Sequence, residues 1–372
     1  MADLVAGAVR RSHGPKTPPP VASRSHDGAW PGSGGPNAAH HSLYAAFQGG
    51  GTGSNPVGGI RLVASGARGL APERSTGGRS QDEGATLLSP RGEGVEMREL
   101  TQDERDEIAR DAGLPQLDAR ELIDAEYLER AIKEMYTEVA TNPGGDFHFL
   151  TGRALAEALG YDPALLDQIP AEAVESFAGV GHYFDLAGLR EGEVVVDLGS
   201  GSGTDLFYAA LQVGPTGRTI GIDMTPAQLE KAARLRDAAG LGAVELIESR
   251  IESVPLPDGV ADCVVSNGVV NLAPDKAAVF AEAARLLRPG GRLALADIVS
   301  GRPLVGRTRR NTDLWAACIG GAIPRESYVG AIESAGLHVE QLRENEYEFL
   351  TEHALQACDK YGVVSVSLLA RK

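Results

Sequence analysis

Short apolar runs alternate with amphipathic segments between residues 190 and 300. Runs rich in β-branched residues are typical of buried strands, whereas apolar positions three and four apart are typical of helices packed on a sheet. Regular alternation of the two predicts a parallel sheet with helices on both faces. The expected strands are 193–198, 219–223, 243–247, 262–266 and 292–297, and the expected helices are 204–212, 226–239 and 274–288.

The pattern changes after residue 299. Helical periodicity at 308–320 and 325–335 is followed by two strand-like segments, 340–350 and 363–370. A closing pair of strands after five strand–helix units predicts an antiparallel edge on an otherwise parallel, Rossmann-like sheet. We therefore expect residues 191–372 to form one α/β core, with an insert on its substrate side.

Residues 97–190 form a helical prologue to this core. Helices are expected near 101–110, 124–136, 153–159 and 163–168. The second of these has one apolar face, made of Tyr127, Leu128, Ala131, Ile132, Met135 and Tyr136. We expect the prologue to form a cap over the glycine-rich loop at 199–203.

Residues 1–96 have a different composition from the rest. They are rich in Gly, Ser, Pro, Ala and Arg and show no apolar period. Such a segment buries too little apolar surface to offset its ordering entropy, which predicts a disordered tail. An alternative follows from Gly53-Ser-Asn-Pro56, which a tRNA T-arm gene sequence, GGTTCGAATCCC, would encode. On that hypothesis the tail is a spurious extension and the true start is near Met97.

A glycine-rich turn follows the first core strand. The valine run at 194–196 ends in Asp197, and glycines occupy positions 199, 201 and 203 before a helix-like segment. Strand, glycine turn and helix let backbone N–H groups approach a nucleotide-like ligand closely. The spacing is G-x-G-x-G after an acid, unlike the G-x-G-x-x-G of nicotinamide sites. Taken alone, the stretch is also compatible with a turn that binds nothing.

A second acid strengthens the ligand interpretation. Asp223 ends the next expected strand, about 20 residues past the glycines, which is the position of a ribose-binding acid. The alternative is that Asp223 helps to start the following helix. Thr225, with Pro226 behind it, already has the sequence signature of that helix's N-cap.

Charge and cysteine usage narrow the class of protein. The net charge of the 372-residue chain is −16, the sum of +2 on residues 1–96 and −18 on residues 97–372, which hold 26 basic and 44 acidic side chains. This leaves no basic footprint for nucleic acid. No apolar run is long enough to span a membrane, and no secretory signal begins the chain. Three widely spaced cysteines predict neither disulfides nor a metal site, so we expect a cytoplasmic protein.

With these motifs, residues 147–350 resemble the class I S-adenosylmethionine-dependent methyltransferases, and within them the arsenite methyltransferases. Three of the stretches that carry the resemblance are common across the class, and the two around 270 and 318 are far more particular. The five stretches are VVDLGSGSG at 195–203, IDMTP at 222–226, SNGVVNLAPDK at 266–276, LLRPGGR at 286–292 and LWAACIGG at 314–321. The implied cofactor is S-adenosylmethionine and the implied partner is a small-molecule methyl acceptor.

The resemblance implies roles for ten cofactor-binding residues. The glycine turn would face the methionine portion of the cofactor, and Asp197 would stabilise that turn. Asp223, at the end of the second strand, would hold the ribose hydroxyls. Met224 would pack on the adenine, and Ile251 and Glu252 would lie beside the adenine edge. Core packing is an equally good explanation for Ile251. The asparagine at 267 would touch the carboxylate or sulfonium. The ten residues are Asp197, Gly199, Ser200, Gly201, Gly203, Asp223, Met224, Ile251, Glu252 and Asn267.

The chain departs from the family at the acceptor site. Arsenite methyltransferases hold trivalent arsenic with three cysteine thiolates, soft ligands for a soft metalloid. Of these positions the chain keeps Cys318, the candidate catalytic residue, while Leu206 and Gly268 replace the other two. Cys263 lies within a strand and is expected to be a core thiol. Arsenite is therefore one acceptor and a small organic molecule, methylated at carbon, nitrogen or oxygen, is the alternative.

Transfer from a sulfonium needs in-line approach and exclusion of water, and an oxygen nucleophile also needs a base. His148 and His182 are the available bases, each alternatively a cap residue without a catalytic role. Aromatic candidates for the acceptor pocket are Phe147, Phe149, Tyr183 and Trp315, although aromatic residues at such positions more often belong to the core. Two further interpretations are open. A nicotinamide-dependent oxidoreductase would bind a different cofactor, and a non-catalytic cofactor-binding module would transfer no methyl group.

Overall fold

The computed structural model describes residues 86–87, 97–111, 117–311, 314–315 and 319–372. The predicted disordered or spurious tail at 1–96 therefore lies almost wholly outside the described residues, as does Cys318. The strands are β1 (Thr86–Leu87), β2 (Val194–Leu198), β3 (Arg218–Asp223), β4 (Val244–Glu248), β5 (Ala261–Asn267), β6 (Leu287–Val299), β7 (His338–Glu344) and β8 (Val364–Arg371).

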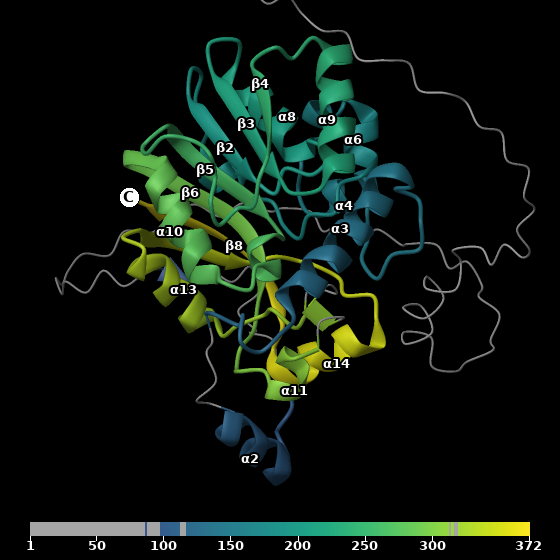
Figure 1. Cartoon of the computed structure of the whole chain (residues 1–372), viewed down its shortest axis with the longest axis vertical. Coiled ribbons are helices and arrows are strands. Elements are labelled where there is room, and N and C mark those ends of the chain that lie inside the picture. The colour runs from purple at the N-terminus through teal and green to yellow at the C-terminus, as the bar shows by residue number, and fades with distance from the viewer. Residues whose placement is uncertain (1–85, 88–96, 112–116, 312–313, 316–318) are drawn as a thin grey trace, which may run out of the picture. The chain divides into compact units, whose positions relative to one another are not determined.

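These strands form one sheet in the order β1-β7-β8-β6-β5-β2-β3-β4 (Figure 1). The pairs among β2, β3, β4, β5 and β6 are parallel, whereas β8 runs antiparallel to both β6 and β7. The predicted Rossmann-like sheet with an antiparallel closing pair is confirmed. The strand order reverses between β2 and β5, and the crevice beside such a switch point is where open α/β sheets bind ligands.

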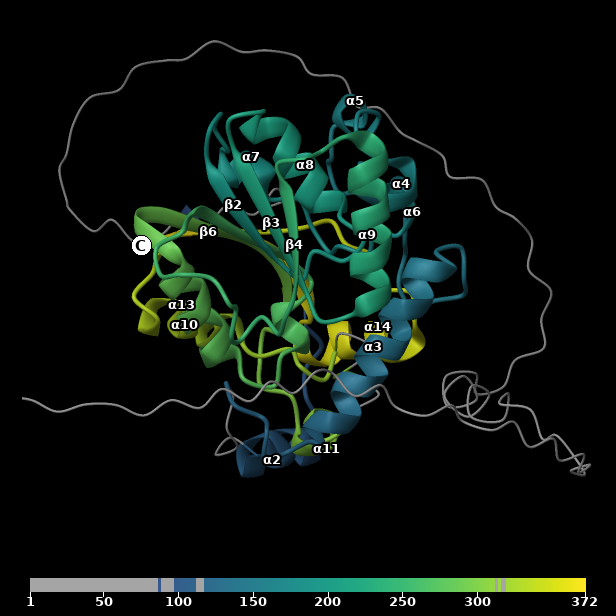
Figure 2. The same cartoon turned by 45° about the horizontal axis from the view of Figure 1, so that its top comes forward.

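Helices cover both faces of this sheet, because its central strands are apolar on both sides. Val195 packs in the core cluster that contains α7 (Phe184–Ala187), α8 (Thr204–Val213) and α9 (Pro226–Ala239). The next residue, Val196, packs in the opposite cluster with α10 (Lys276–Leu286) and α13 (Arg325–Ser334). Figures 1 and 2 show the two helical layers on either side of the strands.

The remaining helices precede the core or follow it. Among the described residues, no helix is both long and apolar enough to cross a membrane. The prologue contains α2 (Gln102–Asp111), α3 (Ala125–Thr141), α4 (Arg153–Ala158), α5 (Pro163–Leu166) and α6 (Ala171–Glu175), the 3₁₀ turn η2 spans Val270–Leu272, and the C-terminal part contains α11 (Gly306–Arg309) and α14 (Glu352–Tyr361).

Three sequence predictions require correction. The strand predicted over 340–350 ends at Glu344, and α14 follows where no element was expected. The Thr351 hydroxyl starts this helix by accepting a hydrogen bond from the Ala354 amide at 3.2 Å, and Ala354, Ala357 and Tyr361 bury its inner face. Strand β6 begins at Leu287, before the glycines predicted to separate helix from strand. Tyr127, predicted on the buried face of α3, is 38% exposed.

Lys276 is buried at the start of α10. Its ammonium donates to the carbonyls of Asn271 and Ala273, at 3.1 and 3.0 Å, and lies 4.8 Å from the centre of the Trp315 ring. Burial lowers the pKa of Lys276 from 10.5 to about 7. The unfolded chain therefore binds more protons than the folded chain between about pH 7 and pH 10, so this lysine makes stability rise with pH across that window.

Lys276→Met removes the charge and keeps a flexible chain of similar length. We expect the rise in unfolding free energy between pH 7 and pH 10 to become shallower than in the parent. Urea denaturation at several pH values in this window measures the slope. Parallel slopes in the two proteins would contradict the account.

Candidate active site

The carboxyl ends of β2, β3 and β5 open on a cavity of about 310 Å³, here called the main cavity. This volume is at the lower end of the range of small-ligand sites. Nine of the ten predicted cofactor residues line it: Asp197, Gly199, Ser200, Gly201, Asp223, Met224, Ile251, Glu252 and Asn267. The tenth, Gly203, is the N-cap of α8, with φ +99°.

The glycine turn holds a backbone conformation that a side chain would disrupt. Gly199 has φ +81°, and a Cβ there would lie 2.3 Å from a methyl carbon of Val269. The amides of Gly199 and Ser200 both donate to the Ile222 carbonyl, at 2.7 and 2.9 Å. The turn is therefore fixed to the end of β3.

Asp223 connects β3 to the same turn. One carboxylate oxygen accepts from the Gly201 amide at 2.9 Å, and the other accepts from the Thr225 amide at 2.8 Å. Burial raises the pKa of Asp223, and the backbone donors oppose that rise. Thr225 is at the N-cap of α9, but its side chain makes no capping bond, so this part of the sequence prediction was wrong. Asp223 itself orders the loop that leads into α9.

Asp197 and Ser200 bring polar atoms without partners to the cavity. Asp197 Oδ2 and Ser200 Oγ are buried, and neither has a hydrogen-bond partner within the described protein. Burial raises the pKa of Asp197 well above its usual range, and the neighbouring Asp205 and Asp223 raise it further. Because unpaired buried polar atoms are costly, a cationic or hydrogen-donating ligand group beside Asp197 would stabilise the site.

Opposite the glycine turn, α3 forms the other wall of the main cavity. Leu128, Ile132 and Tyr136 of this helix line it, as the apolar pattern of the prologue predicts. The Gln228 side chain of α9 donates to the Tyr136 carbonyl at 2.8 Å, and the Lys231 ammonium donates to the Ala140 carbonyl at 2.9 Å. In Figures 1 and 2, α3 lies beside one end of α9. These contacts hold α3 of the prologue, the predicted cap, at the wall of the main cavity.

A buried carboxylate that the sequence analysis did not assign holds this cap in place. Asp205, in the first turn of α8, accepts from the hydroxyls of Tyr161 and Tyr183 at 2.6 and 2.7 Å. Asn267 also donates to Asp205 at 3.0 Å, and its amide oxygen accepts from the Val180 amide at 2.8 Å. Burial raises the pKa of Asp205, and its donors oppose the rise. Asp205 also lines the main cavity.

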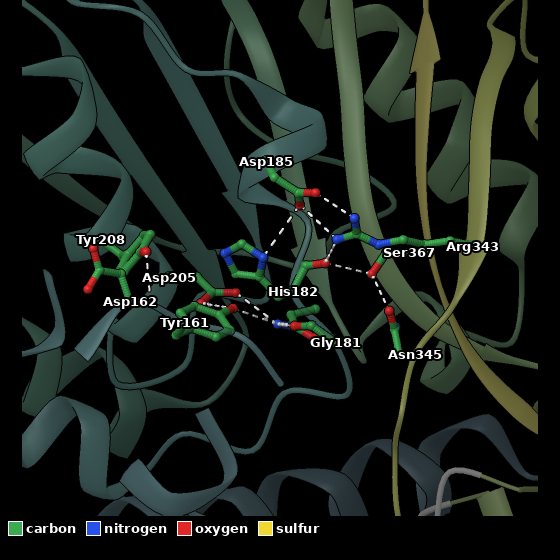
Figure 3. Close-up of polar contacts among 11 residues, drawn as sticks. Tyr161, Asp162, Gly181, His182, Asp185, Asp205, Tyr208, Arg343, Asn345 and Ser367 are labelled. Carbon is green, nitrogen blue, oxygen red and sulfur yellow. Dashed lines mark hydrogen bonds and ion pairs between the residues drawn. The ribbon is translucent and has the colours of Figure 1, made fainter. Parts of the chain in front are cut away.

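The same cap segment is bound to the sheet's far edge. Arg343 of β7 donates to the His182 carbonyl at 2.8 Å and pairs with Asp185, and the Ser367 hydroxyl donates to the His182 carbonyl at 2.8 Å (Figure 3). The His182 ring packs on Tyr161, with ring centres 4.8 Å apart. Of the two candidate histidines, His182 lines neither cavity described here, whereas His148 lines the smaller one.

Tyr161→Phe removes one hydroxyl donor from Asp205 and leaves the ring in place. We expect the free energy of unfolding to fall by about 1–2 kcal/mol, because a buried carboxylate loses a hydrogen bond. Chemical denaturation measures the change. Tyr208→Phe is the control, since Tyr208 is packed in the same aromatic cluster but bonds only weakly, accepting from the Asp162 amide at 3.3 Å. Equal losses in the two variants would contradict the role of Asp205.

A smaller cavity of about 20 Å³, here called the aromatic pocket, adjoins the main cavity. The two share Tyr136 and Ala178, and consecutive residues at the end of β5 line one each, Asn267 the main cavity and Gly268 the aromatic pocket. Phe149 lines the aromatic pocket, and Phe147 stacks on Phe149 with ring centres 5.5 Å apart. The other residues that line it are His148, Val180, Ile298, Tyr347, Phe349, Thr351 and Ala354.

The other acceptor-site candidates lie in the core. Tyr183 and Trp315 are almost fully buried and line neither cavity, so of the two interpretations offered for them the structure favours core packing. Leu206 and Cys263 are fully buried, as expected for a core leucine and a core thiol. Burial raises the pKa of the Cys263 thiol to about 12. The described residues contain no cluster of three His, Cys, Asp or Glu side chains that could hold a metal.

This strand order, with a glycine turn after β2 and an acid at the end of β3, defines a nucleoside-binding α/β enzyme of the class I methyltransferase type. A methyltransferase domain model matches residues 189–353. Arsenite methyltransferase from Halobacterium salinarum is 32% identical over 67% of this chain and 68% of its own length. Arsenite methyltransferase from Aquipseudomonas alcaligenes is 36% identical over 51% of this chain and 57% of its own length.

Among solved structures, the chain is similar to CrArsM, an arsenic(III) S-adenosylmethionine methyltransferase from Chlamydomonas reinhardtii. The match has 32% identity and a TM-score of 0.48, and it covers 60% of this chain and 74% of the other. The chain belongs to the arsenite methyltransferase-like family of class I, S-adenosylmethionine-dependent methyltransferases.

Proposed function

We propose that the main cavity binds S-adenosylmethionine and that the chain transfers its methyl group to a small molecule in the adjoining aromatic pocket. The observation that carries the proposal is the convergence of the glycine turn, the Asp223 carboxylate and the unpartnered oxygen of Asp197 on one cavity. The bound cofactor would supply a methyl group already activated on a sulfonium.

The residues present suit such a ligand. Asp223 would accept hydrogen bonds from the ribose hydroxyls, in addition to those it accepts from Gly201 and Thr225. Met224 and Ile251 would pack on the adenine, with Glu252 at its edge. The carboxyl of Asp197 would face the ammonium of the methionine portion, which offers a donor to its free oxygen.

Cap and sheet together would exclude water from the reaction. The wall formed by α3 closes the main cavity opposite the glycine turn, while Asn267 ties the 178–183 segment to the end of β5. Transfer in a dry site needs the acceptor atom in line with the sulfonium. The junction at Asn267 and Gly268 offers the acceptor that approach from the aromatic pocket.

Arsenite is the acceptor that the names of the relatives favour. An organic molecule is the alternative acceptor, because Gly268 brings no thiol to the aromatic pocket and Leu206 is buried in the core. Cys318, outside the described residues, keeps its proposed role as the one retained thiol. A single thiolate does not provide the three-sulfur site of the family.

Calorimetry and methyl transfer test the proposal together. We expect S-adenosylhomocysteine to bind with a dissociation constant of the order of micromolar, about −8 kcal/mol, and NADH to give no heat. S-adenosylmethionine labelled with tritium in its methyl group should then pass label to an acceptor from a panel that includes arsenite. Binding of NADH in place of S-adenosylhomocysteine would overturn the proposal.

A further inference from the structure

Resting on the function proposed above, we propose that the acceptor is an uncharged, apolar aromatic molecule bearing a hydroxyl, which enters through the aromatic pocket and gives up its proton to His148. The first observation is the wall chemistry. None of the side chains that the structure places around the aromatic pocket is acidic, lysine or arginine. An ionic acceptor would lose its hydration there without a counter-charge, which is costly.

The second observation is the abundance of aromatic rings at this place. Tyr136 stacks on Phe149 with ring centres 6.2 Å apart, and Tyr347 meets Phe349 edge to face at 5.0 Å. All four rings line the pocket. Flat π-surfaces are recognised by such rings through offset stacking and edge contacts. The walls therefore favour a flat, π-rich acceptor over a tetrahedral or pyramidal oxyanion.

The third observation concerns the segments that form the pocket. Of the five large apolar side chains exposed in the described part of the chain, three directly follow a pocket-lining residue: Leu150 after Phe149, Leu350 after Phe349 and Leu355 after Ala354. Their exposed fractions are 38%, 42% and 50%. Scattered exposed leucines need no explanation, whereas three in the segments that form one pocket would give an apolar ligand further surface to contact. We call these three leucines the leucine rim.

The pocket's small volume places the reacting end of the acceptor there. A space of about 20 Å³ holds little more than a hydroxyl or a water molecule. The ring that carries the hydroxyl would then lie against the Tyr347 and Phe349 side chains, and its apolar substituent would lie along the leucine rim. Segment 345–350, which has no regular secondary structure, carries Tyr347 and Phe349 and is the wall best able to adjust.

His148 stands where the hydroxyl would arrive. Its ring lines the pocket, its Nε2 atom is buried, and it meets the Phe149 ring edge to face at 4.7 Å. In the proposed step the acceptor oxygen forms a bond to the methyl carbon. The carbon–sulfur bond breaks with its electron pair passing to sulfur. The hydroxyl proton moves to His148, leaving a methyl ether and S-adenosylhomocysteine.

A matched panel of phenols tests the acceptor class. We expect 4-propylphenol to be converted to its methyl ether, with one S-adenosylhomocysteine formed per ether, measured by mass spectrometry. The charged partners 4-hydroxybenzoate and 4-hydroxybenzylamine should show kcat/KM at least tenfold lower. Equal turnover of charged and neutral phenols, or methylation of arsenite and of no phenol, would overturn the inference.

Substitutions in the full-length chain test whether methyl transfer takes place at the aromatic pocket. Leu350→Asp and Leu355→Asp should each lower kcat/KM for 4-propylphenol severalfold, while Tyr127→Asp, a change at an exposed side chain of α3, should not. His148→Gln should lower kcat by about 100-fold or more, the contribution of a general base, with binding of S-adenosylhomocysteine unchanged. Full activity of His148→Gln would refute the base.

Binding of S-adenosylhomocysteine distinguishes failure of this inference from failure of the proposed function. If S-adenosylhomocysteine binds and no phenol is methylated, this inference falls and the proposed function stands. If S-adenosylhomocysteine does not bind, the proposed function itself is wrong.

Discussion

Asp223→Ala should weaken the binding of S-adenosylhomocysteine by about 100-fold or more, equivalent to at least about 2.7 kcal/mol. Hydrogen bonds to a charged group contribute about 1.5–3 kcal/mol each, and this carboxylate would accept them from two ribose hydroxyls. The substitution also leaves the amides of Gly201 and Thr225 without their present acceptor. The glycine turn would therefore lose order when the ribose loses its partner. Isothermal titration calorimetry measures the change.

Glu248→Ala is the matched control for this variant. Glu248 ends β4 beside Asp223 in the sheet register and is exposed, so the control removes one carboxylate from the neighbouring strand end. We expect its affinity for S-adenosylhomocysteine to stay within about twofold of the parent. Asp223→Asn retains the side-chain volume and shows how much of the loss depends on charge. Parental affinity in Asp223→Ala would contradict the ribose assignment.

Gly199→Ala should remove cofactor binding and lower stability at the same time. The backbone there has φ +81°, and the new methyl group would lie 2.3 Å from a methyl carbon of Val269. Left-handed backbone costs a non-glycine residue about 1–2 kcal/mol, and overpacking adds about 1–3 kcal/mol. We expect a loss of about 2–5 kcal/mol in unfolding free energy, measured by chemical denaturation.

Gly240→Ala separates the two causes. Gly240 has φ +68° at the end of α9, and no atom lies within 4 Å of the position that a Cβ would occupy. This control carries the backbone strain without the collision, so its loss of stability should be about 1–2 kcal/mol. Its binding of S-adenosylhomocysteine should equal that of the parent. Similar losses in both variants would show that contact with Val269 is unimportant.

The parts of the site that local sequence encodes were predictable. Strand, glycine turn and helix follow within 20 residues, and Asp223 ends the next strand at the spacing expected of a ribose acid. The valines at 195 and 196 face opposite clusters, because a strand in the middle of the sheet is covered on both sides. These features depend on neighbouring residues, so a single sequence reveals them.

The hydrogen bonds that hold the cap to the core join residues far apart in the sequence, and the sequence analysis did not predict them. Tyr161 and Asp205 are 44 residues apart, and Arg343 reaches the His182 carbonyl over 161 residues. Only the fold brings such pairs together. The sequence did hold one signal for Asp205: an acid at the start of an otherwise apolar helix, directly after the glycine turn. Helix α14 was missed because its short apolar face follows a strand-like segment.

A crystal structure of the chain with S-adenosylhomocysteine tests the central claim most directly. The account predicts the nucleoside in the main cavity, across the ends of β2 and β3, with both ribose hydroxyl oxygens within about 3 Å of the Asp223 carboxylate. A nucleoside bound elsewhere, or a ribose that makes no hydrogen bond with Asp223, would contradict it.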